Sequence, residues 1–552
     1  MKKALRILFI LMIMISTVVT FAYMRMDQAD KSQTHIDKAA DHSTTASNEN
    51  AAHSRTLFIT DRDFAMQTGQ SHQCTAQFDD GGNAEGLLWS STNENAVTVD
   101  DSGRVTAVGA GDAEIWAVMG RNYKARVKVS VYDDLDAAAA EAVTVLAADG
   151  SDESMNRLED MAAKLSRSKS KSALRIAAML ASITDFRELG ATGGEDAQTI
   201  WTKLIQRRDA AGMESLSEKT LRQAALAAYC QGEKSAAELT LSFTGDCTFA
   251  YFNEERGERH FPAVYLNSGS VSYPFDLTRG VFGADDLTMI NFEGALTNSL
   301  AHKQKQFYFR GEPEYVKILT SSSVEAVTLE NNHSFDYFDT GFNDTMDIMR
   351  EAGIRYTSFH SPAVINVNGC RVVMLSLCMI GIGYQSEFSE QVNQYISRYK
   401  DDDTLIVMNV HWGVESAGTP EPYQIEAAHQ MIDAGVDLVI GHHPHVLQGI
   451  EVYKGHYIAY SLGNFSFGGN TAVSNSDTII FRASFDKSGD GSMKINRISV
   501  VPCCTTSSGS TVNNYQPSPL FGSNGQAVID RLIERNSNLE GGAMSLMWNG
   551  IP

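Results

Sequence analysis

Short apolar runs alternate with amphipathic stretches between residues 239 and 505, and this alternation is the feature that most limits how the chain can fold. The apolar runs have the length of buried strands, and several are separated by stretches of helical periodicity. Two helical stretches, 340–352 and 421–434, are each followed by a glycine that is typical of a helix end. The pattern predicts an α/β domain. Its expected strands are 239–244, 287–292, 324–329, 371–377, 404–410, 437–440 and 457–462.

Polar side chains follow these runs where the strands should end. The densest group is Val439-Ile-Gly-His-His-Pro-His445, which places three histidines in four positions directly after an apolar run. Because ligands of α/β proteins bind beyond the carboxyl ends of the strands, we expect the strand-end residues to meet at one edge. These residues are Asp246, Asn291, Glu293, Asn332, His333, His411, His443 and His445.

The side-chain types in this set indicate a centre for one or two divalent metal ions. The carboxylate of Asp246 can bridge two ions, Asn332 adds a neutral carbonyl oxygen, and imidazoles suit Zn, Mn or Fe. Two ions about 3.5–4 Å apart can hold a phosphate and activate a water molecule. His333, directly after a predicted ligand, is placed to protonate a leaving oxygen. The predicted chemistry is hydrolysis or transfer at a phosphate ester.

Other polar residues near the set have weaker assignments. Arg310 can grip a carboxylate or phosphate in two-point fashion, or form a surface ion pair. Glu415 is a further candidate for substrate binding, together with Asn291. Asp336 can orient His333 or cap the next turn. His442 is expected to support a ligand or to lie at the surface, and Asn464 to fix a turn.

Residues 55–133 have a different pattern, with short alternating runs separated by turn signals, which predicts a small all-β sandwich. The motif Leu88-Trp-Ser-Ser-Thr-Asn93 and the segment 97–109 resemble the bacterial Ig-like group 2 domain. In such a domain Trp89 would fill the core and Gly103 would lie in a hairpin turn. The resemblance implies a spacer or an adhesive module.

Length and composition bound the rest of the chain. At 552 residues it is too long for one core, so we expect several domains. Residues 134–238 are rich in Ala, Leu, Glu and Lys with helical periodicity, which predicts a connector of three to five helices. Residues 506–552 are expected to form a tail that packs on the α/β domain or is partly loose. The net charge of −22 argues against nucleic-acid binding.

The N-terminus predicts a location outside the cytoplasm. A basic start is followed by an apolar run through residues 7–24, which favours an uncleaved membrane anchor over a cleaved signal peptide. Residues 25–54 are polar and without periodicity, as in a disordered linker. The chain is therefore expected to be anchored to the cell membrane and exposed at the surface.

Taken together, the strand-end motifs resemble those of the CapA-like capsule (poly-γ-glutamate) synthesis proteins, a family that is similar to the calcineurin-like metallophosphoesterases. The resemblance implies a four-layer fold with two sheets face to face and helices outside. It implies metal ligands at Asp246, Asn332, His411, His443 and His445, with a general acid at His333. The motifs are Gly245-Asp246, Asn291-Phe-Glu293, Asn331-Asn-His-Ser-Phe-Asp336, His411-Trp-Gly-Val-Glu415, Gly441-His-His-Pro-His445 and Tyr460-Ser-Leu-Gly-Asn-Phe465.

The chain departs from the phosphoesterase pattern at two positions. Thr248 stands where that pattern has a histidine, and Asn291 and Glu293 are the nearest candidates where it has an aspartate. The site is therefore expected to hold one ion, or two with altered affinity.

The expected function is synthesis, attachment or export of an anionic extracellular polymer or its phosphorylated precursor, together with other capsule-synthesis membrane proteins. The alternatives are a non-catalytic polymer-binding or scaffolding component of a capsule machine, and a plain adhesin.

Overall fold

The computed structural model describes residues 55–82, 84–168, 170–193, 196–234, 238–255, 257–358, 361–380, 386–401, 404–487, 493–543 and 551. The chain divides into two compact units, Met1–Thr56 and Leu57–Pro552. The predicted membrane segment 1–24 and the linker 25–54 lie outside the described residues. No helix among the described residues is long and apolar enough to span a bilayer.

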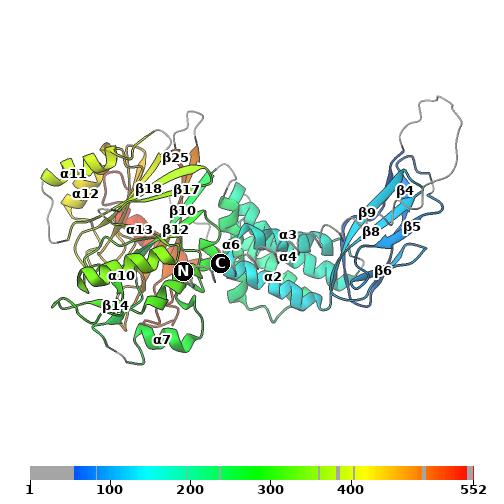
Figure 1. Ribbon diagram of the computed structural model, residues 1–552, viewed down its shortest axis with the longest axis horizontal. Helices are drawn as coiled ribbons and strands as arrows, with labels where there is room; N and C mark the ends of the chain where they lie inside the picture. Colours follow the sequence, from blue (N-terminus) through cyan, green and yellow to red (C-terminus); the bar gives the residue numbers. More distant parts are fainter. Residues whose placement is uncertain are drawn as a thin grey trace, which may run out of the picture. The chain divides into compact units, whose positions relative to one another are not determined.

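The first part of the larger unit is an all-β region, as its alternating sequence predicts (Figure 1). Burial alternates along β8, where Ala113, Ile115 and Ala117 face the core. Trp89 is half-buried at the edge of that core, and Gly103 lies in the turn between β6 and β7 with φ +83°. The strands are β1 (Leu57–Ile59), β2 (Phe64–Gln67), β3 (Ser71–Gln73), β4 (Ala76–Phe78), β5 (Leu88–Ser91), β6 (Val97–Val99), β7 (Arg104–Ala107), β8 (Gly111–Met119) and β9 (Tyr123–Tyr132).

Five helices follow the β region. Each begins after a serine or aspartate whose side chain accepts a hydrogen bond from a backbone N–H of the first turn, which stabilises the helix start. Their buried faces carry alanine, leucine, isoleucine and methionine at helical spacing. The helices are α2 (Leu135–Asp149), α3 (Asp152–Leu165), α4 (Lys171–Thr192), α5 (Ala197–Ala211) and α6 (Glu218–Glu233).

Two large sheets and one small sheet make up the described α/β region. The small sheet has the order β11-β14-β13, with β11 (Tyr251–Phe252), β13 (Ala295–Leu296) and β14 (Phe309–Gly311). In the first large sheet, the strand order is β16-β15-β12-β10-β24-β25-β26, with β23 also paired to β10. Its strands are β10 (Glu238–Thr248), β12 (Leu287–Phe292), β15 (Ala326–Thr328), β16 (Arg355–Thr357), β23 (Asn464–Phe467), β24 (Asp477–Lys487), β25 (Met493–Cys504) and β26 (Ser518–Pro519). In the second, the order is β17-β18-β19-β20-β22-β21. Its strands are β17 (Ala363–Val367), β18 (Cys370–Cys378), β19 (Thr404–His411), β20 (Leu438–His442), β21 (Ile450–Tyr453) and β22 (His456–Ala459).

The two large sheets pack face to face and are covered by helices on their outer faces. Along β19, Leu405 and Val407 join a core shared with β10 and β12 of the first sheet, whereas Ile406 and Met408 face α12. This alternation follows from the two-residue repeat of a strand buried on both faces. The expected four-layer architecture is therefore present. Outer elements are α7 (Phe261–Ser268), α8 (Arg279–Phe282), α9 (Val316–Thr320), α10 (Phe338–Glu351), α11 (Ser386–Ser397) and α12 (Pro422–Asp433). Helix α13 (Gly522–Asn536) instead packs Val528, Ile529 and Leu532 into the core between the two sheets.

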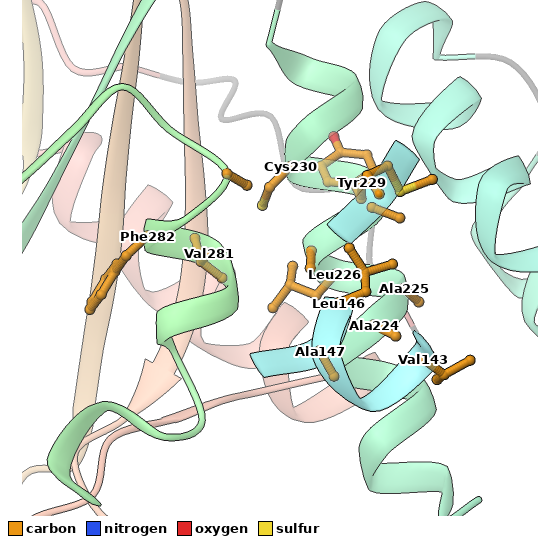
Figure 2. Packing of buried hydrophobic residues seen from close by; sticks show 14 of the residues in the cluster. Val143, Leu146, Ala147, Ala224, Ala225, Leu226, Tyr229, Cys230, Val281 and Phe282 are labelled. Atoms are coloured by element: carbon orange, nitrogen blue, oxygen red, sulfur yellow. The ribbon is translucent and has the colours of Figure 1, made fainter. Parts of the chain in front are cut away.

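The helical connector and the first sheet share one hydrophobic core. Figure 2 shows side chains of α2, α6 and α8 gathered in that core, among them Leu146, Leu226 and Val281. Arg482 of β24 is buried beside it, with its guanidinium 3.3 Å from Glu233 of α6. The same side chain donates hydrogen bonds to carbonyl oxygens of Cys230, Val281 and Ala284. The connector is thus joined to the sheet by apolar and ionic contacts.

Candidate metal centre

The predicted site residues come from adjacent strands of both sheets. Asp246 at the end of β10 is in register with Asn291 of β12, and His411 at the end of β19 is in register with His442 of β20. The loop after β20 then carries His443 and His445 back toward Asp246. The carboxyl ends of the central strands therefore meet at one point, as the sequence pattern predicts.

Glycines before the ligand-type residues allow the strands to approach closely. A Cβ atom on Gly245 would lie 1.9 Å from the carbonyl oxygen of Gly463, and one on Gly441 would lie 2.0 Å from that of Tyr460. No side chain fits at such distances. Because glycine precedes Asp246 and His442, the backbone at these two residues can pack closely against the neighbouring strands.

Asp246, Glu293 and His445 form a compact group of potential ligands. One donor atom from each lies within 4.8 Å of the other two. The Asp246 Oδ2 atom is 3.1 Å from His445 Nδ1 and accepts a hydrogen bond from the backbone N–H of His443 at 3.3 Å. His442 Nδ1 is 3.4 Å from Asp246 Oδ1. A second group of the same compactness joins Glu415, His443 and His445, so His445 belongs to both.

Amide side chains hold the acidic residues in place. The Asn291 amide donates to Asp246 Oδ1 at 2.8 Å and to Glu293 Oε1 at 3.0 Å, and its own oxygen accepts from the Asn331 amide at 3.2 Å. Asn291 is fully buried. This geometry positions two carboxylates. The substrate-binding role of Asn291 stays a prediction.

Asn332 and His411 lie next to this group. The Asn332 Oδ1 atom is 3.0 Å from His411 Nε2, and His411 Nδ1 is 3.9 Å from Glu293 Oε1. His411 is 1% exposed. One connected cluster therefore contains the side chains of Asp246, Glu293, Asn332 and His411. Each of them has an oxygen or nitrogen atom that could bind a metal ion.

The loop that carries the histidine pair has unusual backbone geometry. His443 and His445 have φ values of +96° and +58°, on either side of Pro444. Non-glycine residues in this region are strained by about 1–3 kcal/mol each. Such strain is maintained only where the surrounding structure fixes the conformation. Here it directs both imidazoles toward the acidic cluster.

His333 is held by a buried carboxylate on its far side. The Asp336 Oδ2 atom lies 2.8 Å from His333 Nδ1 and also accepts from the backbone N–H of Phe309 at 2.9 Å. Lys305 Nζ lies 2.7 Å from Asp336 Oδ1. Asp336 therefore orients His333, one of the two roles expected from the sequence, while its backbone carbonyl accepts from the Lys303 N–H.

Burial and the neighbouring charges set the proton distribution in the cluster. Burial alone would raise the pKa of Asp246, but the adjacent imidazoles of His442 and His445 hold that pKa well below its usual range. Burial, with the charge of Asp246, raises the pKa of Glu293 well above its usual range. The bond to Asp246 overcomes burial and raises the pKa of His445 to about 9.

The other imidazoles are shifted in the opposite direction. Burial and the nearby histidines lower the pKa of His411 well below its usual range, and burial with His445 lowers that of His443 to about 4. Burial also lowers the pKa of His333, against the influence of Asp336. Neutral imidazoles are the form that binds a metal.

Buried atoms of the described site that lack a hydrogen-bond partner test whether a cation would fit. They include Glu293 Oε2, His442 Nδ1 and His443 Nδ1. A buried polar atom without a partner costs about 1–3 kcal/mol, which coordination of a cation would remove. Carboxylate oxygens and imidazole nitrogens are donors suited to Zn, Mn or Fe. The residues present therefore fit a divalent metal ion.

The comparisons with known proteins agree with this architecture. Residues 240–469 match the family described as bacterial capsule synthesis protein PGA_cap, and residues 56–129 match the bacterial Ig-like domain (group 2). The α/β domain belongs to the PGA_cap family. The residues that match this family include the cluster around Asp246, His411 and His445.

Several named proteins are similar to the chain. It is 29% identical over 282 residues to the PGA biosynthesis protein CapA of Bacillus subtilis, covering 48% of this chain and 72% of that protein. It is 31% identical over 255 residues to the capsule biosynthesis protein CapA of Bacillus anthracis, covering 42% and 60%. A probable polyglutamine synthesis accessory protein of Mycobacterium tuberculosis is 26% identical over 210 residues, covering 33% and 55%.

Two weaker candidates within the PGA_cap domain have different placements. Arg310 is buried and held by Glu254 through two hydrogen bonds of 2.7 and 3.1 Å, so its guanidinium is not directed at the histidines. This corresponds to the ion-pair alternative, in a buried position. Glu415 is exposed and lies with His443 and His445.

Three further residues lie near the site. The sequence did not predict a role for Lys305, and it predicted only supporting or turn roles for His442 and Asn464. Lys305 pairs with Asp336 and lies 3.3 Å from His333 Nδ1. Asn464 Oδ1 lies 2.9 Å from His445 Nδ1 and so contacts the imidazole. His442 is buried rather than at the surface. Asn464 was detectable from its Gly-Asn position after a strand, whereas nothing near Lys305 in the sequence indicated its contact.

Proposed function

We propose that this chain is a metal-dependent phosphoesterase-type protein of capsule synthesis, which acts outside the cytoplasm on an anionic polymer of the poly-γ-glutamate kind or on its phosphorylated precursor. The observation that carries the proposal is the meeting of Asp246, Glu293 and His445 within 4.8 Å of one another, beside the His333–Asp336 pair. The named relatives in capsule and polyglutamate synthesis support the biological setting.

The chain's own residues have separable tasks in this proposal. Asp246, Glu293, Asn332, His411, His443 and His445 would hold one or two divalent ions, Zn, Mn or Fe. When bound, the metal would supply positive charge to a phosphate and acidify a water molecule. Asn291 fixes the two carboxylates. Asp336 orients His333, which would give a proton to the departing oxygen.

Metal content and hydrolysis test the proposal together. Purified protein should contain Zn, Mn or Fe by elemental analysis and should hydrolyse bis(p-nitrophenyl) phosphate or p-nitrophenyl phosphate. The His443→Ala variant should lose metal and most activity. His429→Ala is the matched control, because His429 pairs with Glu451 away from the cluster. Wild-type protein without bound metal, and no more active than His443→Ala, would refute the enzyme assignment.

A second candidate is a non-catalytic binding or scaffolding component. Thr248 motivates it: its buried hydroxyl stands at the position of a phosphoesterase histidine and lacks a hydrogen-bond partner. Capture on immobilised γ-linked polyglutamate distinguishes the two. Retention that persists after chelation and in a His333→Ala variant would favour binding over catalysis.

The proposed location depends on the N-terminal apolar run. An anchored, surface-exposed chain should remain in the membrane fraction after a high-salt wash and be degraded when intact cells are treated with protease. Release into the medium would instead indicate a cleaved signal. Co-purification with other capsule-synthesis membrane proteins would support a shared assembly.

A further inference from the structure

A cavity of about 510 Å³ adjoins the proposed catalytic site. His333 and His445 line one end, so a molecule in the cavity would touch both the proposed proton donor and the acidic cluster. The volume suits a small organic group. The cavity is therefore the direct continuation of the site, and its walls define what can be attached to the reacting phosphate.

Four phenylalanines form one wall of this cavity. Phe252 stacks on Phe307 with ring centroids 5.7 Å apart, and Phe252 and Phe309 are 6.1 Å apart. Phe309 then meets Phe467 edge to face at 5.7 Å. The series runs from Phe307, which is 38% exposed, to the buried Phe309 and Phe467.

The aromatic wall reaches the reacting groups themselves. The ring of Phe309 lies 4.2 Å from that of His333, and the ring of Phe467 lies 4.8 Å from that of His445, measured between centroids. The apolar surface of Phe309 therefore lies directly against His333, the proposed proton donor. A charged group bound at that distance would lose its hydration without a compensating partner.

Apart from the histidines, the polar part of the cavity wall is acidic or neutral. Glu255 is 3.0 Å from His260, and Glu415 stands beside the histidine pair. The remaining described lining includes Asn470 and Thr471, and none of the lining residues described is a lysine or arginine. A negatively charged group bound here would be repelled by these carboxylates, whereas an uncharged group would not be.

We propose that the phenylalanine wall is a subsite for an uncharged, flat or aromatic group carried by the leaving alcohol of the substrate. This inference rests on the proposed function, because it assigns the cavity next to His333 to the departing side. In hydrolysis, the water oxygen forms the new bond to phosphorus and releases a proton to solvent. The bond from phosphorus to the alcohol oxygen breaks, and that oxygen keeps the electron pair and takes the His333 proton.

Binding of two phosphonates that cannot be hydrolysed tests the subsite. Isothermal titration of the full-length chain, in the presence of Mn²⁺, should show benzylphosphonate binding about tenfold more tightly than methylphosphonate. Phe307→Ala should remove most of that preference, because this ring is exposed and its loss leaves the buried rings packed. Phe58→Ala is the matched control, with 37% exposure and a position outside the cavity lining. Equal affinities in wild type, or an equal loss in both variants, would overturn the subsite.

Hydrolysis of benzyl phosphate and methyl phosphate separates failure of the subsite from failure of the proposed function. Turnover of both esters without preference would leave a phosphoesterase and remove the aromatic subsite. Selective binding of benzylphosphonate without turnover of either ester would keep the subsite and remove the catalytic assignment. Preference for the benzyl ester in kcat/KM, reduced in Phe307→Ala, is the result expected.

Discussion

Asp336 controls the proton of His333 through a contact of 2.8 Å. The protonated imidazole is the form required of a general acid, so activity should fall as pH rises through the pKa of His333. Burial lowers that pKa from its usual value, and Asp336 opposes the decrease. The proposed phosphoesterase activity should therefore be highest on the acidic side of about pH 6.5, the usual histidine pKa.

Replacing Asp336→Asn should lower the pKa of His333 further, because the negative charge that favours the imidazolium is lost and Lys305 remains. The falling limb of kcat/KM should move about one to two pH units to lower pH, the effect of one charge-assisted hydrogen bond. The pH profiles of both proteins measure this shift. An unchanged profile would show that His333 is not the proton donor. Asp339→Asn, in the first turn of the helix that follows this loop, provides the control.

At the scale of single residues, the sequence predicted which side chains converge but not the contacts that support them. Asp246, His411 and His445 could be found because each follows an apolar run, and parallel strands end at a common edge. The contacts of Lys305 and the burial of Arg310 depend on loops whose course is set by tertiary packing. Local sequence carries no signal for such contacts.

At the scale of elements, the junction of α6 and β24 depends on one buried ion pair. Arg482 and Glu233 are 1% and 2% exposed at their side chains. Arg482→Met would leave Glu233 charged without its partner, which costs about 3–5 kcal/mol in buried pairs. Urea unfolding of the variant should show a correspondingly lower free energy.

The exposed pair of Arg531 and Asp477 is the control for this measurement, with a 2.6 Å contact. Solvent screening limits such pairs to about 0–1 kcal/mol, so Arg531→Met should unfold almost like wild type. If the two variants were equally stable, the buried pair would have no special role in joining the connector to the sheet.

Helices were predicted more completely than the paired strands. The stretches 340–352 and 421–434 correspond to α10 and α12, because helical periodicity and the following glycines are local signals. The long antiparallel pair β24 and β25 was not resolved as two strands from sequence. Its register depends on β10, more than 200 residues away, so no local pattern specifies it.

At the scale of the whole molecule, the hydrophobic cores indicate where the chain can be shortened. The Ig-like core consists of residues between Ile59 and Val131, whereas the connector shares its core with the α/β domain. A chain starting at residue 134 should therefore stay folded and bind the proposed metal as the intact chain does. A chain starting at residue 238 should aggregate, because it exposes the connector-facing side of the first sheet.

Thermal unfolding and metal analysis of the two shortened chains check this expectation. The longer one should melt within a few degrees of the corresponding transition in the intact protein. Cooperative melting of the shorter chain, with metal bound, would show that the connector is dispensable for the fold.

The left-handed backbone at His443 implies a conflict between durability and chemistry. Glycine adopts φ near +96° without a steric penalty, so His443→Gly relieves about 1–3 kcal/mol of strain while adding about 0.5–1 kcal/mol of entropy to the unfolded chain. The metal-free variant should have a melting temperature a few degrees above that of metal-free wild type, and it should bind the proposed metal ion more weakly. The strained backbone at His443 thus lowers the stability of the loop but places the imidazole beside Glu415 and His445.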